Sequence, residues 1–289
     1  MRHSSRSRTA AEALAPSTPS CASSGLPLLH GLWRSWLWTL GADVLPAALR
    51  QGSSPEVQGT EMAASSKDAS AARALTKREG EGARQDAADK ALEAVLRAWQ
   101  SPGRHYHSLA HLGACLTLLR EWARPHGLTP SEEALLGLAL CFHDAVYDPR
   151  RDDNEVRSAE LARELLQGVG LTAGSTETVV NLVLMTAHGQ VLEDVCLSRP
   201  LVNLLLDIDL AVLGAEEPTF EQYERDIRQE YAWVDAERYR QGRAQVLSRF
   251  LPRQAGGRSG FSHVYRTEVA RAQRESAAQA NLRSALAAL

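Results

Sequence analysis

Cysteine is scarce in this chain of 289 residues, and its four copies are widely spaced. Cys21, Cys115, Cys141 and Cys196 include no CxxC pair, so the chain has no obvious disulfide framework. Cys115 and Cys141 fall in apolar helical patterns, where a reduced and buried thiol is the ordinary state. We therefore expect a reducing compartment, namely the cytoplasm.

Long apolar runs and a surplus of one charge sign are also missing. No run of about 18 apolar residues occurs, so we expect no membrane span. The chain carries 32 Lys and Arg against 35 Asp and Glu, a net charge of −3. This balance excludes a global basic field, and we expect no nucleic-acid partner. With 44% hydrophobic residues, the chain can still bury an ordinary core.

Alternating apolar and polar positions are rare, whereas helical spacing recurs along most of the chain. From Asp86 onward, apolar residues repeat at helical intervals, and Gly or Pro separates the segments. Thr129, Pro130 and Glu132 form a helix start, with a cap, a proline in the first turn and an acid at the third position. The sequence therefore predicts an all-α fold.

Two segments lack this pattern. Residues 1–31 are predicted to be a tail; its first 24 residues are rich in Ser, Ala and Arg, with Glu12 the only acid. That composition fits a disordered tail or an organellar transit peptide, which would change the predicted location. Residues 51–85 are polar without apolar periodicity and are predicted to be a flexible linker or insert.

Histidines cluster in RHYHSLAHL, residues 104–112. His107 and His111 are four residues apart, so on a helix both imidazoles lie on one face. The spacing alone fits a polar helix edge as well as a site. The interpretation as a site is favoured only if other polar groups lie near the two histidines.

Two apolar segments carry carboxylates that are costly to bury. His143 and Asp144 follow the apolar run ALLGLALCF, and Asp207 and Asp209 interrupt LLLDIDLAVLG. Such groups cost several kcal/mol in a core unless something compensates them, and a metal ion does so. The His-Asp pair could instead cap its helix end. Two aspartates two apart on a helix face different ways, so we expect only one to enter a site.

Imidazole nitrogen and carboxylate oxygen from separate helices suit a divalent ion such as Mn, Fe, Co, Zn or Mg. The order H…HD…D, led by YHxxxH, resembles the HD-domain superfamily, and most closely its branch of predicted metal-dependent phosphohydrolases. The likeness covers about Leu92 to Leu289. The matching segments are RHYHSLAHL, FHDAVYDP with DNEVRSAELA, LDIDLAVLG, IRQEY and YRTEVARAQRESAAQANL.

The resemblance implies an HD-type helical bundle with additional C-terminal helices. Residues 32–42 resemble the start of that domain, which predicts one domain over 32–289 with 51–85 as an insert. The implied metal ligands are His111, His143, Asp144 and Asp209. Asp209 is preferred to Asp207 because the superfamily's final aspartate commonly precedes a leucine, here Leu210.

Other implied roles concern the substrate. His107 matches a position that faces the phosphate leaving group, and Asp148 is expected to orient water or a ligand histidine. Arg104 and Arg150 are expected to hold the phosphate. His188, either a phosphate contact or a helix C-terminal cation, is the only histidine between Asp144 and Asp209.

We therefore expect a metal-dependent phosphohydrolase acting on a small phosphate ester or nucleotide, with metal-activated water as nucleophile. The partner would be a small-molecule phosphate. Two alternatives keep the fold, an iron-dependent oxygenase and a non-catalytic binding module stabilised by its metal. Superfamily members with a two-iron centre place two histidines in the interval where this chain has His188 alone. Metal analysis and oxygen consumption separate the oxygenase from the hydrolase.

Overall fold

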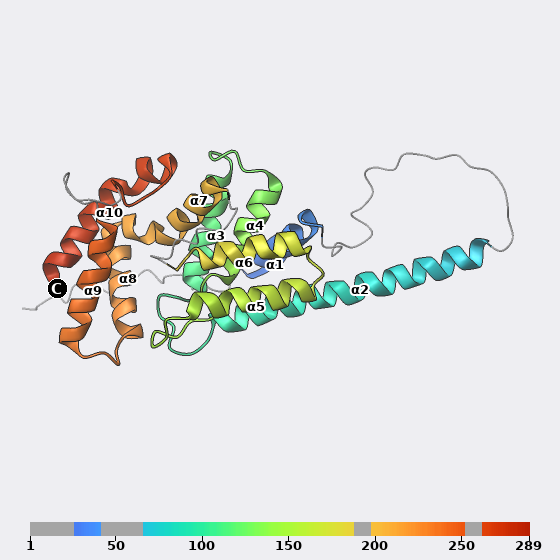
Figure 1. The fold of residues 1–289 in the computed structure, drawn as a ribbon, viewed down its shortest axis with the longest axis horizontal. Helices are drawn as coiled ribbons and strands as arrows, with labels where there is room; N and C mark the ends of the chain where they lie inside the picture. Colours follow the sequence, from blue (N-terminus) through green and yellow to red (C-terminus); the bar gives the residue numbers. More distant parts are fainter. Residues whose placement is uncertain (1–25, 42–65, 188–197, 252–261) are drawn as a thin grey trace, which may run out of the picture.

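The computed structural model describes residues 26–41, 66–187, 198–251 and 262–289, and all its regular elements in these ranges are helices (Figure 1). This confirms the all-α prediction. None of the described helices combines the length and hydropathy needed to cross a bilayer. The elements are α1 Leu26–Thr39, α2 Ser66–Trp99, α3 Leu109–Ala123, α4 Pro130–Phe142, α5 Asn154–Gly168, α6 Ala173–Leu184, α7 Arg199–Asp209, the 3-10 helix η2 Leu210–Gly214, α8 Glu217–Glu230, α9 Ala236–Phe250 and α10 Glu268–Ala288.

Helix α4 is the central element, and α1, α3, α5, α6 and α7 all contact it. Nearly every residue from Ala134 to Phe142 is buried, as expected for a helix that is apolar on all sides. Its start is the predicted capping box. The Thr129 hydroxyl accepts the Glu132 N–H, and the Glu132 carboxylate accepts the Thr129 N–H. The sequence signal at this helix start is confirmed.

Helix α1 packs tightly on α4. Trp33 and Leu37 are fully buried, and the Trp33 indole donates a hydrogen bond to the Ala88 carbonyl of α2. The Trp36 ring lies so close to Gly137 that a Cβ added there would be 2.5 Å from it. Helix α1 begins at Leu26, so residues 26–31 belong to a core helix and not to the predicted tail. Leu29, in the first turn of α1, is buried in the core.

Helix α2 begins at Ser66, so the second part of the predicted insert over 51–85 is helical; residues 51–65 lie outside the described ranges. Ala, Lys, Arg, Glu and Gln dominate residues 66–85 and favour helix without any apolar stripe. Periodicity therefore missed a segment that intrinsic propensity explains. Ala88, Leu92, Val95 and Trp99 anchor the C-terminal part of α2 in the core.

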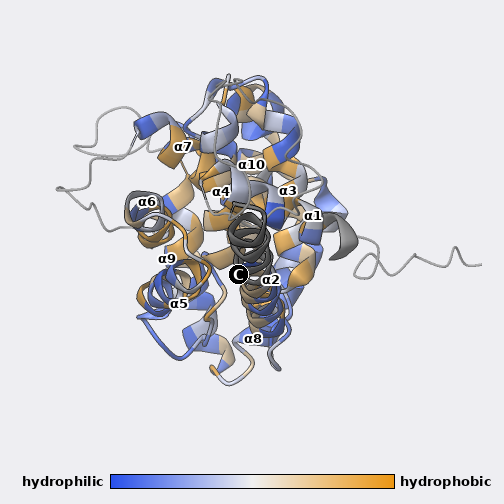
Figure 2. Ribbon diagram, turned by 90° about the vertical axis from the view of Figure 1, so that its right-hand side faces the viewer, coloured by the Kyte–Doolittle hydropathy of each residue, from blue (hydrophilic) through white to orange (hydrophobic). Residues whose placement is uncertain are grey.

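The C-terminal helices α8, α9 and α10 gather at one end of the molecule (Figure 1). Figure 2 shows hydrophobic residues concentrated on α3, α4 and α7, while α5 is mainly hydrophilic. Helix α10 packs on η2 and α9, and the Asn281 amide donates to the carbonyls of Leu213 and Ala215. The end of α7 and the start of η2 therefore lie between the α4 bundle and the C-terminal helices.

Candidate metal centre

Four side chains from three parts of the fold converge at the end of α7. His111 comes from α3, His143 and Asp144 follow the end of α4, and Asp209 ends α7. One ligand atom from each lies within 4.8 Å of all the others. His111 and His143 are buried, and both carboxylates are largely so. The residues predicted as metal ligands are thus brought together and could hold an ion.

The spacing of these atoms fits one ion. His143 Nε2 lies 3.2 Å from His111 Nε2, 3.1 Å from Asp144 Oδ2 and 3.4 Å from Asp209 Oδ1. Four N and O ligands arranged tetrahedrally at about 2.1 Å from a common ion stand about 3.4 Å apart. Two nitrogens and two oxygens suit a borderline divalent ion.

A hydrogen bond to Nδ1 of the His143 ring determines which ring nitrogen is available to bind a metal ion. Its Nδ1 lies 2.8 Å from the Leu140 carbonyl, so Nδ1 carries a proton and donates it. Nε2 then faces the cluster, as in histidines that bind metals through this nitrogen.

Burial and the two carboxylates shift the pKa values of the cluster residues. Burial lowers the pKa of His111 and so favours the neutral, metal-binding imidazole. Burial alone would also lower the pKa of His143, but the Asp144 carboxylate raises it well above its ordinary value. Burial opposes ionisation of Asp144, yet His143 holds its pKa below the usual range. A proton on His143 and a cation bound to Nε2 are alternative ways of balancing the two carboxylates.

Asp207 lies close in sequence but has a different role. Its carboxylate accepts hydrogen bonds from the backbone N–H groups of Arg266 and Thr267, at the start of α10. Burial raises its pKa, and these two donors partly offset that effect. The expectation that only one of the two aspartates enters the cluster is confirmed.

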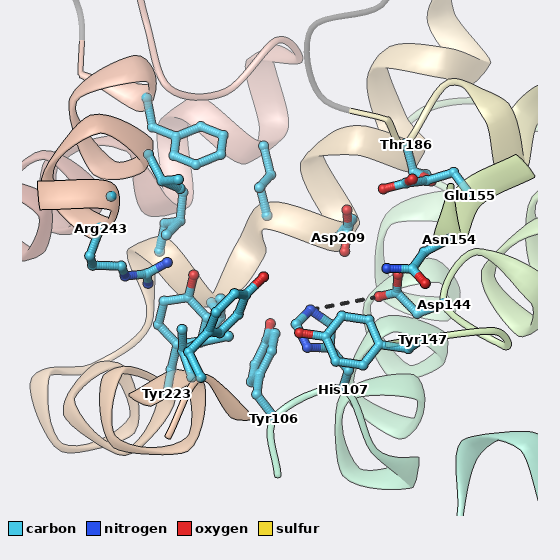
Figure 3. Close-up of a pocket in the computed structure, with 18 of the residues that line it drawn as sticks. Tyr106, His107, Asp144, Tyr147, Asn154, Glu155, Thr186, Asp209, Tyr223 and Arg243 are labelled. Carbon is cyan, nitrogen blue, oxygen red and sulfur yellow. Dashed lines mark ion pairs between the residues drawn. The ribbon is translucent and has the colours of Figure 1, made fainter. Parts of the chain in front are cut away.

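His107 lies beside the cluster and outside the group of four. Its Nδ1 is 2.6 Å from Glu230 Oε2, and its Nε2 is 4.0 Å from Asp144 Oδ2, the pair marked in Figure 3. Its ring stacks on Tyr147 with 4.0 Å between centroids. This side chain is therefore held on one nitrogen, while the other faces the metal ligands.

Glu230, at the end of α8, holds this arrangement together, and sequence reasoning missed it. Oε1 accepts the backbone N–H groups of His105, Tyr106 and His107, and Oε2 accepts the Tyr147 hydroxyl. Burial would raise its pKa, but the hydrogen bond from His107 and the backbone donors lower it to about 2. IRQEY was among the segments carrying the family likeness, yet an acid ending an amphipathic helix looks like any surface acid.

The Arg104 guanidinium, expected from the sequence to hold phosphate, is engaged by groups of the protein itself. It donates to the Ser101 hydroxyl and to the carbonyls of His107, Asp144 and Ala145. The rings of Trp99 and Tyr147 lie within 5.5 Å of its charged carbon. Arg104 therefore clamps the turn after α4 onto the segment before α3.

Arg150 and Asp148 also have structural roles, in the turn that leads into α5. Arg150 lies over the Trp233 ring at 5.2 Å, and its backbone N–H donates to Asp148 Oδ1. The Asn154 amide closes the same turn by donating to the Asp148 carbonyl. Phosphate binding by Arg150 and a catalytic role of Asp148 stay predictions beside these structural contacts; His188 lies outside the described residues.

A cavity of about 580 Å³ opens beside the cluster, between α5 on one side and α8 and α9 on the other (Figure 3). Asp144, Asp209 and His107 line the end next to the ligands. A small molecule in this cavity would touch the cluster and His107 together.

No protein-family model matches the chain, and comparisons with curated proteins and with solved structures give no match either. Membership of the HD-domain superfamily therefore stays a prediction that rests on the sequence motifs.

Proposed function

We propose that the protein is a metal-dependent phosphohydrolase acting on a small phosphate ester. The observation that carries this proposal is the buried group of two imidazoles and two carboxylates, spaced for one ion, at the end of an open cavity. A divalent ion bound there supplies Lewis acidity, lowering the pKa of water and polarising a phosphoryl oxygen. His111, His143, Asp144 and Asp209 would hold it.

The second part of the proposal is proton transfer by His107. Glu230 accepts the Nδ1–H of this ring and fixes its orientation, so Nε2 is the nitrogen that can meet a substrate. Nε2 donates a proton to the oxygen of the departing alcohol, the role of a general acid. Tyr147 supports the ring from its face and shares the Glu230 carboxylate.

The arrangement also limits access of water to the reacting groups. His111 and His143 are almost inaccessible, and Tyr106 and Trp99 lie against their rings. Charges in such a site interact more strongly than in bulk water. A cation held by the four ligands would therefore stabilise negative charge on a phosphoryl oxygen more strongly than it would in bulk water.

The test is metal analysis of the purified protein together with hydrolysis of phosphate esters in the presence of Mn, Fe, Co, Zn or Mg. We expect one ion per chain and metal-dependent release of phosphate. His143→Ala should lose both, because the remaining ligands are left buried without compensation. Bound metal without phosphatase activity would reject hydrolysis, and oxygen consumption would then identify the oxygenase alternative.

A further inference from the structure

We infer that the cavity beside the cluster binds a phosphate monoester whose organic group carries an aromatic ring. This inference rests on the proposed function and specifies its substrate class. It follows from the side chains that line the cavity away from the metal ligands.

The cavity gathers nearly all the tyrosines of the chain. Five of the six line it, namely Tyr106, Tyr147, Tyr223, Tyr231 and Tyr239. Two pairs among them are in ring contact: Tyr106 and Tyr223 have centroids 4.6 Å apart, and Tyr231 and Tyr239 6.5 Å. Aromatic rings favour edge-to-face and offset contacts with other rings, beyond the gain from burying apolar area. This wall suits a flat ring better than a sugar or a polyol.

Aliphatic and phenyl side chains form another part of the lining, beside the polar residues Asp152, Asn154, Glu155 and Thr186. The apolar part is formed by side chains of η2, α8 and α9, namely Leu210, Val212, Leu213, Ile227, Val246 and Phe250. Figure 3 shows Asp144, Asp209 and His107 on one side and Tyr223 with Arg243 on the other. A ligand with its phosphate at the cluster would therefore place its organic part against tyrosine and aliphatic side chains.

The charges favour a single phosphate. Each arginine lining the described part of the cavity already pairs with a carboxylate: Arg151 with Asp153, Arg238 with Asp235 and Arg243 with Glu224. Arg243 also lies 5.0 Å over the Tyr223 ring, which further occupies it. A second or third phosphate would find only arginines that are already paired with carboxylates, so polyphosphate esters fit poorly.

One tyrosine of the cavity wall has an unsatisfied hydroxyl group. The Tyr239 hydroxyl is buried and has no hydrogen-bond partner in the described part of the molecule, although its residue lines the cavity. A buried hydroxyl without a partner is costly, and a ligand whose binding shifts this ring enough to expose the hydroxyl would relieve that cost. At about 580 Å³, the cavity falls in the usual range for small-molecule sites and has room for a ring and its linker.

The first experiment compares esters whose leaving groups are all alkyl alcohols, so that leaving-group chemistry does not mask ring binding. With the metal-loaded protein, kcat/KM for benzyl phosphate should exceed that for methyl phosphate and glycerol 3-phosphate by about tenfold or more. A nucleoside 5′-monophosphate, whose ring is attached through a sugar, tests whether the ring must lie close to the phosphate. Its triphosphate is tested as a competitive inhibitor, because hydrolysis at an anhydride bond has a different leaving group, and it should bind less tightly than the monophosphate. Equal kcat/KM for methyl and benzyl phosphate, or tighter binding of the triphosphate than of the monophosphate, would overturn the inference.

The second experiment narrows the cavity. Gly242 of α9 lines it, and a Cβ there would meet no atom within 4 Å, so Gly242→Leu should fold and obstruct the ring site. It should raise KM for benzyl phosphate about tenfold more than KM for methyl phosphate. Gly82→Leu on α2 is the matched control, since Gly82 is also helical with open space around it. Gly82→Leu should leave KM unchanged for both esters. Equal effects of Gly242→Leu on KM for the two esters would reject the ring site.

Binding of benzylphosphonate, which has no ester bond, separates this inference from the proposed reaction. In one outcome no ester is hydrolysed, yet calorimetry shows that benzylphosphonate binds, that methylphosphonate does not, and that Gly242→Leu weakens the binding. The ring site then stands, and the phosphohydrolase proposal fails. If esters are hydrolysed without ring preference, and both phosphonates bind equally, the phosphohydrolase stands and the ring site fails.

Discussion

Asp207 and Asp209 stand two residues apart at the end of α7, yet their carboxylates serve different parts of the molecule. Asp207 accepts the backbone N–H groups that begin α10, whereas Asp209 Oδ1 lies 3.3 Å from His111 Nε2 in the metal cluster. One short segment therefore both anchors the C-terminal helix and completes the candidate metal centre.

This division predicts opposite phenotypes for two conservative variants. Asp209→Asn should lose the bound ion, because an amide is a poor replacement for a carboxylate ligand. Asp207→Asn should keep its metal but lower the free energy of unfolding by about 2 kcal/mol, because an amide places a donor against two N–H groups. Metal analysis and urea denaturation measure the two effects. Loss of metal in both variants would show that the carboxylates are not independent.

The two histidines of RHYHSLAHL should also differ. His111→Ala should lose metal and phosphatase activity together, while His107→Ala keeps its metal but loses roughly a hundredfold in turnover, the scale for a missing general acid. The loss should shrink for p-nitrophenyl phosphate, whose leaving group departs without protonation. A rate loss in His107→Ala that is independent of the leaving group would reject the general-acid role.

Glu230 predicts a pH dependence of stability. Its pKa is about 2 in the folded protein, below the ordinary value of 4.5. The folded state thus binds this proton less readily than the unfolded chain does, so the carboxylate stabilises the fold above pH 4.5. That stabilisation is lost as the pH falls from 4.5 towards 2.

Glu230→Gln should flatten the dependence of unfolding free energy on pH in this window and lower stability at pH 7. Glu221→Gln on the same helix is the control, because Glu221 forms only an exposed pair with Arg225. It should change stability by less than about 1 kcal/mol. Identical acid transitions of Glu230→Gln and the wild type would contradict the assigned role.

The contact between Trp36 of α1 and Gly137 of α4 can be tested by mutation. Gly137→Ala would normally stabilise a helix by about 1 kcal/mol. Here the new Cβ would lie 2.5 Å from the Trp36 ring, so we expect destabilisation by about 1–3 kcal/mol. Trp36→Leu in the same chain should relieve part of this loss. Additive effects in the double variant would mean that α1 does not dock on α4 as described.

The sequence revealed features whose signal is local. Thr129 and Glu132 cap α4 through neighbouring backbone groups, so three residues suffice to recognise the motif. His143 and Asp209 stood out because polar groups next to long apolar runs need compensation. The family likeness, not spacing alone, then separated Asp209 from Asp207.

Features that depend on distant partners could not be predicted in this way. Glu230 and Arg104 are ordinary surface residue types until the fold brings His105–His107 and the carbonyls of Asp144 and Ala145 to them. A cation near histidines looks the same in sequence whether it binds phosphate or backbone. Only the geometry shows that every nitrogen of the Arg104 guanidinium is taken.

The Glu230 contact has a consequence for the order of events during synthesis. Its carboxylate accepts the His105 N–H across 125 positions of the chain. While the ribosome is still making α7, the segment before α3 has therefore emerged without its acceptor, and Asp209 has yet to join the other ligands. The four metal ligands therefore cannot come together on a growing chain until Asp209 has left the exit tunnel, and Glu230 can fix His107 only after α8 has followed.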